Sequence, residues 1–299
     1  MPHGDHFGTM RRQGAWMGGL LAFLIPALLA GPAVAQDEDE HDDWWKSVKI
    51  SYHRSPTLSL SYGLTSVTQE DFQPAIADAG NLQLKIGGSM IRWEDSEAGI
   101  INYKFEYFDL ATIAPRLRGA SPGSDAAVES WRVGGSFESG LGYGAPESMS
   151  LILYDSWGFN WSKVVVPDQQ LTADELNTLK NYEGSLRFGT LGEGGVKVRV
   201  SKIFSIDAGY ERSMIFPRTL FWGWVGSETI ERIIQWGADG FVDRVLDSSP
   251  AAAPVVRFVL KNGISWGFYE LRKKQMNWPF TSAPGMLNDT WKVGLSMMF

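Results

Sequence analysis

The chain has 299 residues, no cysteine and a formal net charge of -7. Without cysteine it forms neither disulfides nor thiolate metal sites, and it lacks the thiol that a lipoprotein signal acylates. Six carboxylates cluster near the N-terminus and the rest of the chain is close to neutral, so a nucleic-acid partner is excluded.

The N-terminal segment has the layout of a cleaved secretory signal. Two arginines (Arg11, Arg12) precede an apolar run over residues 16–30 and the small residues 33–35. We predict a signal peptide over residues 1–35 and export by the Sec route, with a twin-arginine signal as the weaker alternative. The acidic residues 36–43 that follow are expected to be a solvated, disordered leader.

From residue 44 onward, apolar and polar residues alternate in repeated short runs. These runs lie at 48–52, 58–64, 82–86, 101–107, 131–137, 186–200 and 206–210. Alternation predicts strands with one apolar face, and no later apolar run approaches the roughly 20 residues of a membrane helix. The chain also carries 13 Trp, 16 Phe and 9 Tyr. A barrel in a membrane fits this pattern, and a secreted soluble β-sandwich is the alternative.

Two segments have helical spacing instead. Residues 172–181 begin with Thr172 and Glu175 at the spacing of a capping box. Residues 227–246, within an insert over 216–252, place apolar residues at helical intervals. We expect this amphipathic helix to be a plug or lid at the barrel mouth, or a helix in a long extracellular loop. Beyond it, Asn262-Gly263 predicts a β-hairpin between strands 254–260 and 264–271.

The last strand carries the most specific pattern. Trp291, Leu295, Met297 and the terminal Phe299 lie at alternate positions, with Gly294 between them. This ending resembles the assembly signal of Gram-negative outer-membrane β-barrel proteins. The resemblance implies location in the cell outer membrane, contact with outer-membrane lipid, and recognition by the barrel assembly machinery during insertion.

The expected fold is therefore all-β, with an antiparallel transmembrane β-barrel over residues 44–299. Ten strands result if 46–66 and 183–200 are each one strand, and twelve result if both are hairpins. With ten strands, the longer connections 67–79, 110–126 and 159–181 share the outward side, where loops of such barrels are longer.

Function is then expected in the lumen. Alternation assigns both signs of charge to it, and we predict a small channel or transport barrel for a small solute. The alternative is a non-conducting structural or partner-binding, adhesin-like barrel. The candidate lumen-lining residues are Lys85, Lys104, Glu106, Arg132, Glu138, Arg187, Lys197, Arg199, Asp207, Glu211 and Lys292.

Enzyme chemistry is not expected, and an outer-membrane hydrolase ranks third. Catalysis near neutral pH commonly uses histidine, yet of four histidines only His53 falls near the barrel. The stretch 263–267 spells a nucleophile elbow, but no histidine follows it. No metal site or other cofactor is expected.

Overall fold

A computed structural model describes residues 54–119, 125–146, 148–167, 169 and 171–299. The predicted signal peptide, the acidic leader and all four histidines lie outside the described residues.

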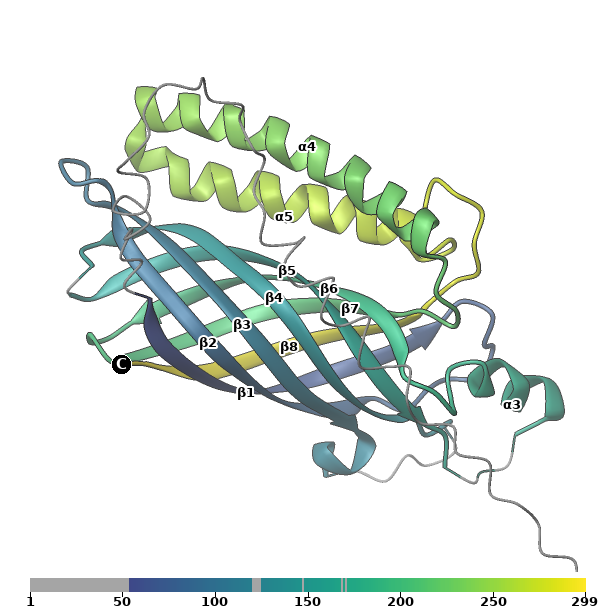
Figure 1. The fold of residues 1–299 in the computed structure, drawn as a ribbon. Helices are drawn as coiled ribbons and strands as arrows, with labels where there is room; N and C mark the ends of the chain where they lie inside the picture. The colour runs from purple at the N-terminus through teal and green to yellow at the C-terminus, as the bar shows by residue number, and fades with distance from the viewer. Residues whose placement is uncertain (1–53, 120–124, 147, 168, 170) are drawn as a thin grey trace, which may run out of the picture. The chain divides into compact units, whose positions relative to one another are not determined.

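The described chain forms a closed β-barrel in which every strand is antiparallel to its neighbours (Figure 1). The last strand pairs with the first, so the sheet has no free edge. The barrel is as expected, but the predicted number of strands is wrong, because there are eight rather than ten or twelve. The strands are β1 (Ser55–Gln69), β2 (Ala79–Asp95), β3 (Ile100–Ala114), β4 (Glu129–Gly144), β5 (Ser150–Val165), β6 (Arg187–Arg199), β7 (Phe204–Ile215) and β8 (Met286–Met298).

The alternating residues explain why these segments form strands of a barrel. In β1, Ser59 and Ser61 are buried inside, while Leu60 and Tyr62 are exposed outside. The strand β1 thus presents mainly small or polar residues to the narrow interior and larger apolar residues to the surroundings, as most of β8 also does. The strand β6 continues through its glycine-rich part, so the reading of 183–200 as one strand is the correct one.

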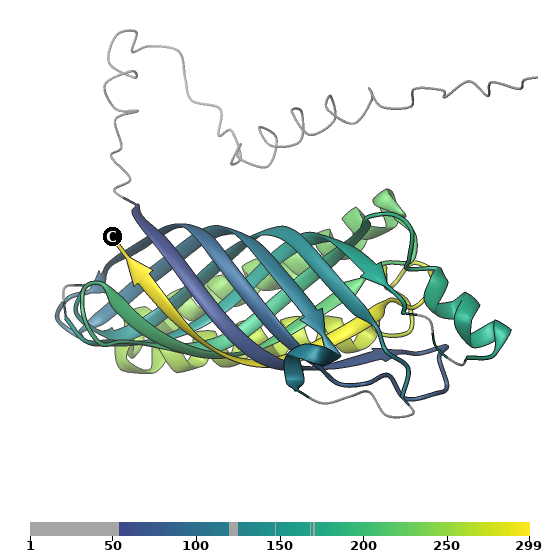
Figure 2. The same ribbon diagram turned by 90° about the horizontal axis from the view of Figure 1, so that it is seen from below.

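The connections sort by length between the two ends of the barrel. Residues 96–99, 145–149 and 200–203 make short turns at one end, named here the short-turn end, where β8 also finishes. Residues 70–78, 115–128, 166–186 and 216–285 make longer connections at the other end, named the long-loop end. The three longer connections predicted to share one side therefore do so (Figure 2).

Three α-helices and two short 3-10 helices lie in these connections. In α3 (Ala173–Lys180), both bonds of the predicted capping box between Thr172 and Glu175 are present, which confirms that prediction. The 3-10 helices are Pro115–Arg118 and Pro250–Ala252. Within the described residues, no helix combines the length and the apolar character needed to cross a membrane.

The other two helices, α4 (Phe221–Ser248) and α5 (Ala253–Arg272), form an antiparallel hairpin between β7 and β8. The hairpin runs along the outer wall of the barrel, and α5 packs on β4, β5 and β6 (Figures 1 and 2). A helix thus occupies the region predicted to be helical, but it neither plugs nor covers the mouth.

The hairpin predicted at Asn262-Gly263 is wrong, because both residues lie inside α5. The two strands that this prediction added account for the difference between ten and eight. The physical reason is a stripe of polar residues at helical spacing, in which Arg257, Lys261 and Ser265 follow one another at intervals of four. When the segment is helical, Arg257 pairs with Asp155 on the barrel wall and Lys261 pairs with Asp239 on α4.

Candidate functional site

The interior of the barrel is the candidate site, and side chains fill it in three layers. An interior of about eight strands is just wide enough to be filled by side chains. A layer of ion pairs lies in the middle, an aromatic layer lies toward the short-turn end, and an apolar layer closes the long-loop end.

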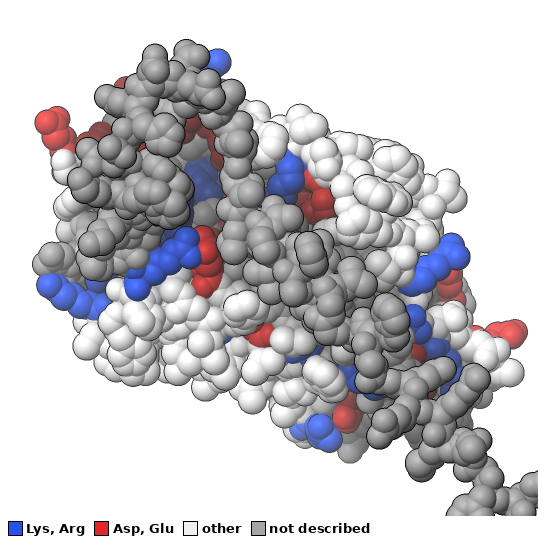
Figure 3. Space-filling model, in the orientation of Figure 1, with Lys and Arg blue, Asp and Glu red and all other residues white. Residues whose placement is uncertain are grey.

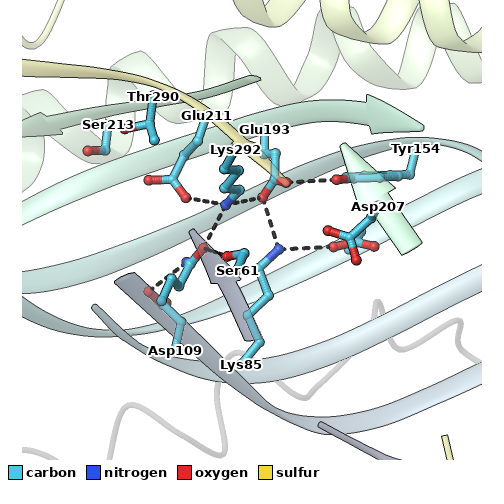
Figure 4. A network of polar contacts seen from close by, with 12 residues as sticks. Ser61, Lys85, Asp109, Tyr154, Glu193, Asp207, Glu211, Ser213, Thr290 and Lys292 are labelled. Carbon is cyan, nitrogen blue, oxygen red and sulfur yellow. Dashed lines mark hydrogen bonds and ion pairs between the residues drawn. The ribbon is translucent and has the colours of Figure 1, made fainter. Parts of the chain in front are cut away.

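Lys292 of β8 is at the centre of the ion-pair layer (Figure 4). Its Nζ lies 2.8 Å from Glu193 Oε2 and 2.7 Å from Glu211 Oε2. It also donates to Gln83 Oε1 at 2.6 Å. One ammonium therefore joins β8 to β6, β7 and β2 across the lumen, and its three donors are used fully.

Two further branches extend from this centre. Lys85 Nζ lies 2.9 Å from Glu193 and 3.3 Å from Glu138, and Lys197 Nζ lies 2.8 Å from Glu138. On the other side, Arg132 lies 2.6 Å from Glu211 and 3.2 Å from Asp109. The layer is thus one connected network whose acidic and basic groups alternate. The network comprises Gln83, Lys85, Asp109, Arg132, Glu138, Glu193, Lys197, Glu211 and Lys292.

Burial makes the pairing necessary. The side chains of Glu193 and Glu211 are 0 % exposed and that of Lys292 is 1 % exposed. Removing one partner of a buried ion pair leaves an uncompensated charge and costs about 3–5 kcal/mol. The network therefore holds the strands in one register and resists the entry of anything that would separate its charges.

The aromatic layer lies on the short-turn side of the network. The Tyr103 hydroxyl donates to Glu138 at 2.9 Å, and the Tyr154 hydroxyl donates to Glu193 at 2.7 Å. Lys197 lies 4.7 Å from the centroid of the Tyr103 ring and 5.3 Å from that of Tyr154. These cation–π contacts surround the lysine ammonium with aromatic rings. The layer comprises Ile101, Tyr103, Phe105, Tyr107, Ile152 and Tyr154.

The apolar layer lies at the long-loop end. It combines the inward-facing ends of strands with side chains from the loop around α3, namely Val67, Phe72, Ala126, Val128, Val164, Leu179, Tyr182, Ile215 and Met286. Tyr182, which lies outside the strands, is 1 % exposed and donates to the Pro284 carbonyl at 3.0 Å. Burial raises the pKa of its phenol, so the ring stays neutral in this apolar closure.

The structure places most of the candidate lumen residues inside. The buried ones are Lys85, Arg132, Glu138, Lys197, Arg199, Asp207, Glu211 and Lys292. Arg187 lies instead near the long-loop mouth, where it donates to the carbonyl groups of Tyr182, Glu183 and Pro217. Among the described residues, no group of three or more His, Cys, Asp or Glu is arranged to hold a metal ion.

Two candidates were assigned to the wrong face. Lys104 is exposed on the outer surface, and Glu106 forms an ion pair there with Arg54. In β3 the tyrosines at 103 and 107 point inward, although apolar and aromatic residues of a membrane barrel are expected to face the lipid. The reason is the register of β3 with β2, which sets Asp109 against Lys85 and turns every second residue of β3 inward with that aspartate.

Sequence reasoning also missed residues of the site. Asp109, Glu193, Tyr103 and Tyr154 are part of the network or contact it. Glu193 lies among the glycines of β6, and it has the same parity as Lys197 on that strand. That shared parity could have predicted that Glu193 faces the lumen. Alternation alone could not distinguish the inward tyrosines from lipid-facing ones.

The residues of the predicted assembly signal lie on β8 and just after it. Trp291 and Leu295 are 70 % and 62 % exposed on the outer wall, and Phe299 is 66 % exposed. Met297 is half-buried, and Gly294 faces inward, where a Cβ would lie 2.8 Å from Asp207 Oδ2. Their recognition by the assembly machinery remains a prediction.

Comparison with known proteins finds similarity at the level of architecture. Neisserial surface protein A (NspA) is 9 % identical over 82 % of this chain and 97 % of its own, with a TM-score of 0.38. Ail, the attachment invasion locus protein of Yersinia pestis, is 12 % identical over 82 % of this chain and 99 % of its own, with a TM-score of 0.31.

Those neighbours are outer-membrane β-barrel proteins. This chain is a closed antiparallel β-barrel, as expected from the resemblance of its last strand to the outer-membrane β-barrel class. No family model matches the chain. No curated protein matches it in sequence. Similarity at this level carries no assignment of function.

Proposed function

We propose that the protein is an outer-membrane barrel whose lumen is sealed, and that it acts through its outer surface and loops rather than by passing a solute. The observation that supports this proposal is the ion-pair layer around Lys292, with aromatic and apolar layers on its two sides. The role that follows is that of a structural or partner-binding element of the envelope.

The outer wall supports location in a membrane. Large apolar side chains are exposed on strands around the barrel, including Leu60 at 53 %, Phe108 at 72 % and Trp291 at 70 %. On the face drawn in Figure 3, uncharged residues form broad areas and the charged ones occur in small groups. Soluble monomers rarely expose apolar surface on this scale. The strands have 12–17 residues and are therefore long enough to cross the hydrocarbon core, which takes roughly 9–11 residues of a tilted strand.

The filled lumen supports a non-conducting barrel over the small channel that the sequence favoured. A water path would have to separate pairs such as Lys292–Glu211 or displace the rings that pack against Lys197. The first change breaks a buried ion pair, and the second removes the aromatic packing around a buried ammonium, so both cost free energy. A channel therefore requires a second arrangement of all three layers.

Planar-bilayer recording tests the proposal. Protein whose folding is verified by different gel migration before and after boiling is added to a bilayer, and a porin added to the same membrane verifies detection. We expect no unitary current steps from the folded protein. Reproducible steps that scale with the amount of folded protein would contradict the sealed lumen and favour the small channel.

A further inference from the structure

The exposed face of the α4–α5 hairpin is apolar over most of its length. On α4, Trp236 is 69 % exposed and Ile233 is 57 % exposed. On α5, Val259 is 61 % exposed and Trp266 is 56 % exposed. Other exposed positions are glycines at which a Cβ would meet no atom within 4 Å, namely Gly237, Gly240 and Gly263. Between its ends, the hairpin thus presents mainly hydrocarbon and backbone outward.

Between the ends of the hairpin, most charged side chains lie on the opposite side, within the hairpin and against the barrel, and the partly exposed Asp239 is paired with Lys261 of α5. Arg272 is 2.6 Å from Glu231 and 3.1 Å from Glu228, and these three side chains are at most 9 % exposed. Arg257 is 2.6 Å from Asp155 on the outer face of β5. A helix packed on a water-soluble domain buries its apolar side and exposes its charges, so this hairpin has the reverse arrangement.

The contact with the barrel is close and specific. Glu228 accepts a hydrogen bond from the Trp157 indole at 2.9 Å, and Tyr143 donates to the Ala251 carbonyl at 2.7 Å. Gly194 on β6 leaves room for α5, because a Cβ there would overlap Asn262. A cavity of about 30 Å³ between the hairpin and the wall is lined by Glu228, Glu231, Arg212, Arg272 and others. The polar groups of the hairpin are therefore held in a built interface.

The length of the apolar face matches that of a membrane barrel. From Trp222 to Phe241, α4 extends for about 30 Å at 1.5 Å per residue, compared with an apolar band about 25 Å tall on such barrels. Within this stretch the partly exposed carboxylate of Asp239 is paired with Lys261, and further exposed charges occur beyond it, at Asp243 and Arg244 near the short-turn end and at Lys274 near the long-loop end. The face is thus bounded by charge at both ends, as the barrel wall would be.

We infer that the α4–α5 hairpin lies inside the membrane as an outer layer of the barrel, with its exposed face in contact with lipid acyl chains. Over β4–β6, lipid then contacts the two helices, whereas around the rest of the barrel it contacts the strands directly. Acyl chains are the occupant because the exposed face continues the apolar wall of the neighbouring strands at the same level. Neither helix would be stable there alone, since its charges need partners on the other helix and on β5.

This inference rests on the proposed membrane location, and thiol labelling tests the two separately. The chain has no cysteine, so single-cysteine variants report one position each. Ile234→Cys and Val259→Cys probe the hairpin, Phe108→Cys probes the lipid-facing wall of β3, and Lys274→Cys marks water. Each variant is reconstituted in phosphatidylcholine vesicles, verified as folded by gel migration, and treated with a membrane-impermeant maleimide from both sides.

We expect Ile234→Cys and Val259→Cys to react at least about tenfold more slowly than Lys274→Cys, and as slowly as Phe108→Cys, because hydrocarbon excludes the reagent and suppresses the thiolate. Fast labelling of both hairpin variants beside a protected Phe108→Cys would overturn the inference and leave the membrane barrel intact. Fast labelling of Phe108→Cys would overturn the membrane location, and with it the inference. Protection accompanied by efficient disulfide formation between two Ile234→Cys molecules at low protein-to-lipid ratio would show that a second copy covers the face instead of lipid.

Discussion

Lys292→Met tests the energetic role of the ion-pair layer. Methionine retains much of the lysine stem but removes the ammonium that lies within 2.8 Å of both Glu193 and Glu211. Each carboxylate keeps one cation, Lys85 for Glu193 and Arg132 for Glu211. We therefore place the loss at the lower end of the range for a broken buried pair, about 3 kcal/mol, which raises the unfolding constant by roughly two orders of magnitude.

The assay is urea unfolding of the folded barrel in lipid vesicles, followed by tryptophan fluorescence and by gel migration. Lys274→Met is the matched control, because Lys274 lies in the loop after α5 with a side chain that is 80 % exposed, and its replacement is expected to change stability by about 0.5 kcal/mol or less. A double-mutant cycle with Glu211→Gln should give a coupling of about 1–3 kcal/mol between the two positions. A loss below about 1 kcal/mol together with additive effects in the cycle would refute the argued role of the network.

Two further predictions concern the wall and the C-terminus. Gly87→Ala should destabilise the barrel by about 1–3 kcal/mol in the same unfolding assay, because its Cβ would overlap the Glu106 carbonyl oxygen on β3. The control Gly135→Ala should cost much less, because no atom lies nearer than 3.8 Å to its added Cβ. Equal losses in the two variants would show that the close contact at Gly87 does not limit stability. Deletion of Phe299 should prevent membrane assembly in cells, seen as loss of the heat-dependent gel shift in the envelope fraction. The control Trp222→Ala removes another exposed aromatic ring and should leave assembly intact. Normal assembly without Phe299 would contradict the prediction that the C-terminal strand is the assembly signal.

The barrel itself could be predicted from the sequence because alternation is a local property of each strand. In β1 and β8, small or charged residues alternate with Leu, Val and Trp, and the observed faces follow that pattern. The sorting of short and long connections followed from the same strands. Pairing of each strand with its neighbour in the chain followed from the same pattern, but the number of strands did not.

The parts that failed depend on contacts between distant segments. The 254–271 region contains both a strong turn dipeptide and a helical stripe, and the stripe prevails only because Arg257 meets Asp155 and Lys261 meets Asp239. Likewise, β3 carries aromatic and charged residues on alternate positions. Which set points inward is decided by pairing with Lys85 on β2, and a single strand does not contain that information.

Access of a small charged reagent to the middle of the lumen tests the central claim most directly. Ser136 lies inside at 2 % exposure, and Met149 lies in a short turn at 69 % exposure. In vesicles, the thiol of Ser136→Cys should remain unmodified by a small charged methanethiosulfonate over times that fully modify Met149→Cys, because closed layers lie on both sides of it. Modification of Ser136→Cys at a rate comparable to that of Met149→Cys in folded protein would show that water reaches the interior and would contradict the sealed barrel.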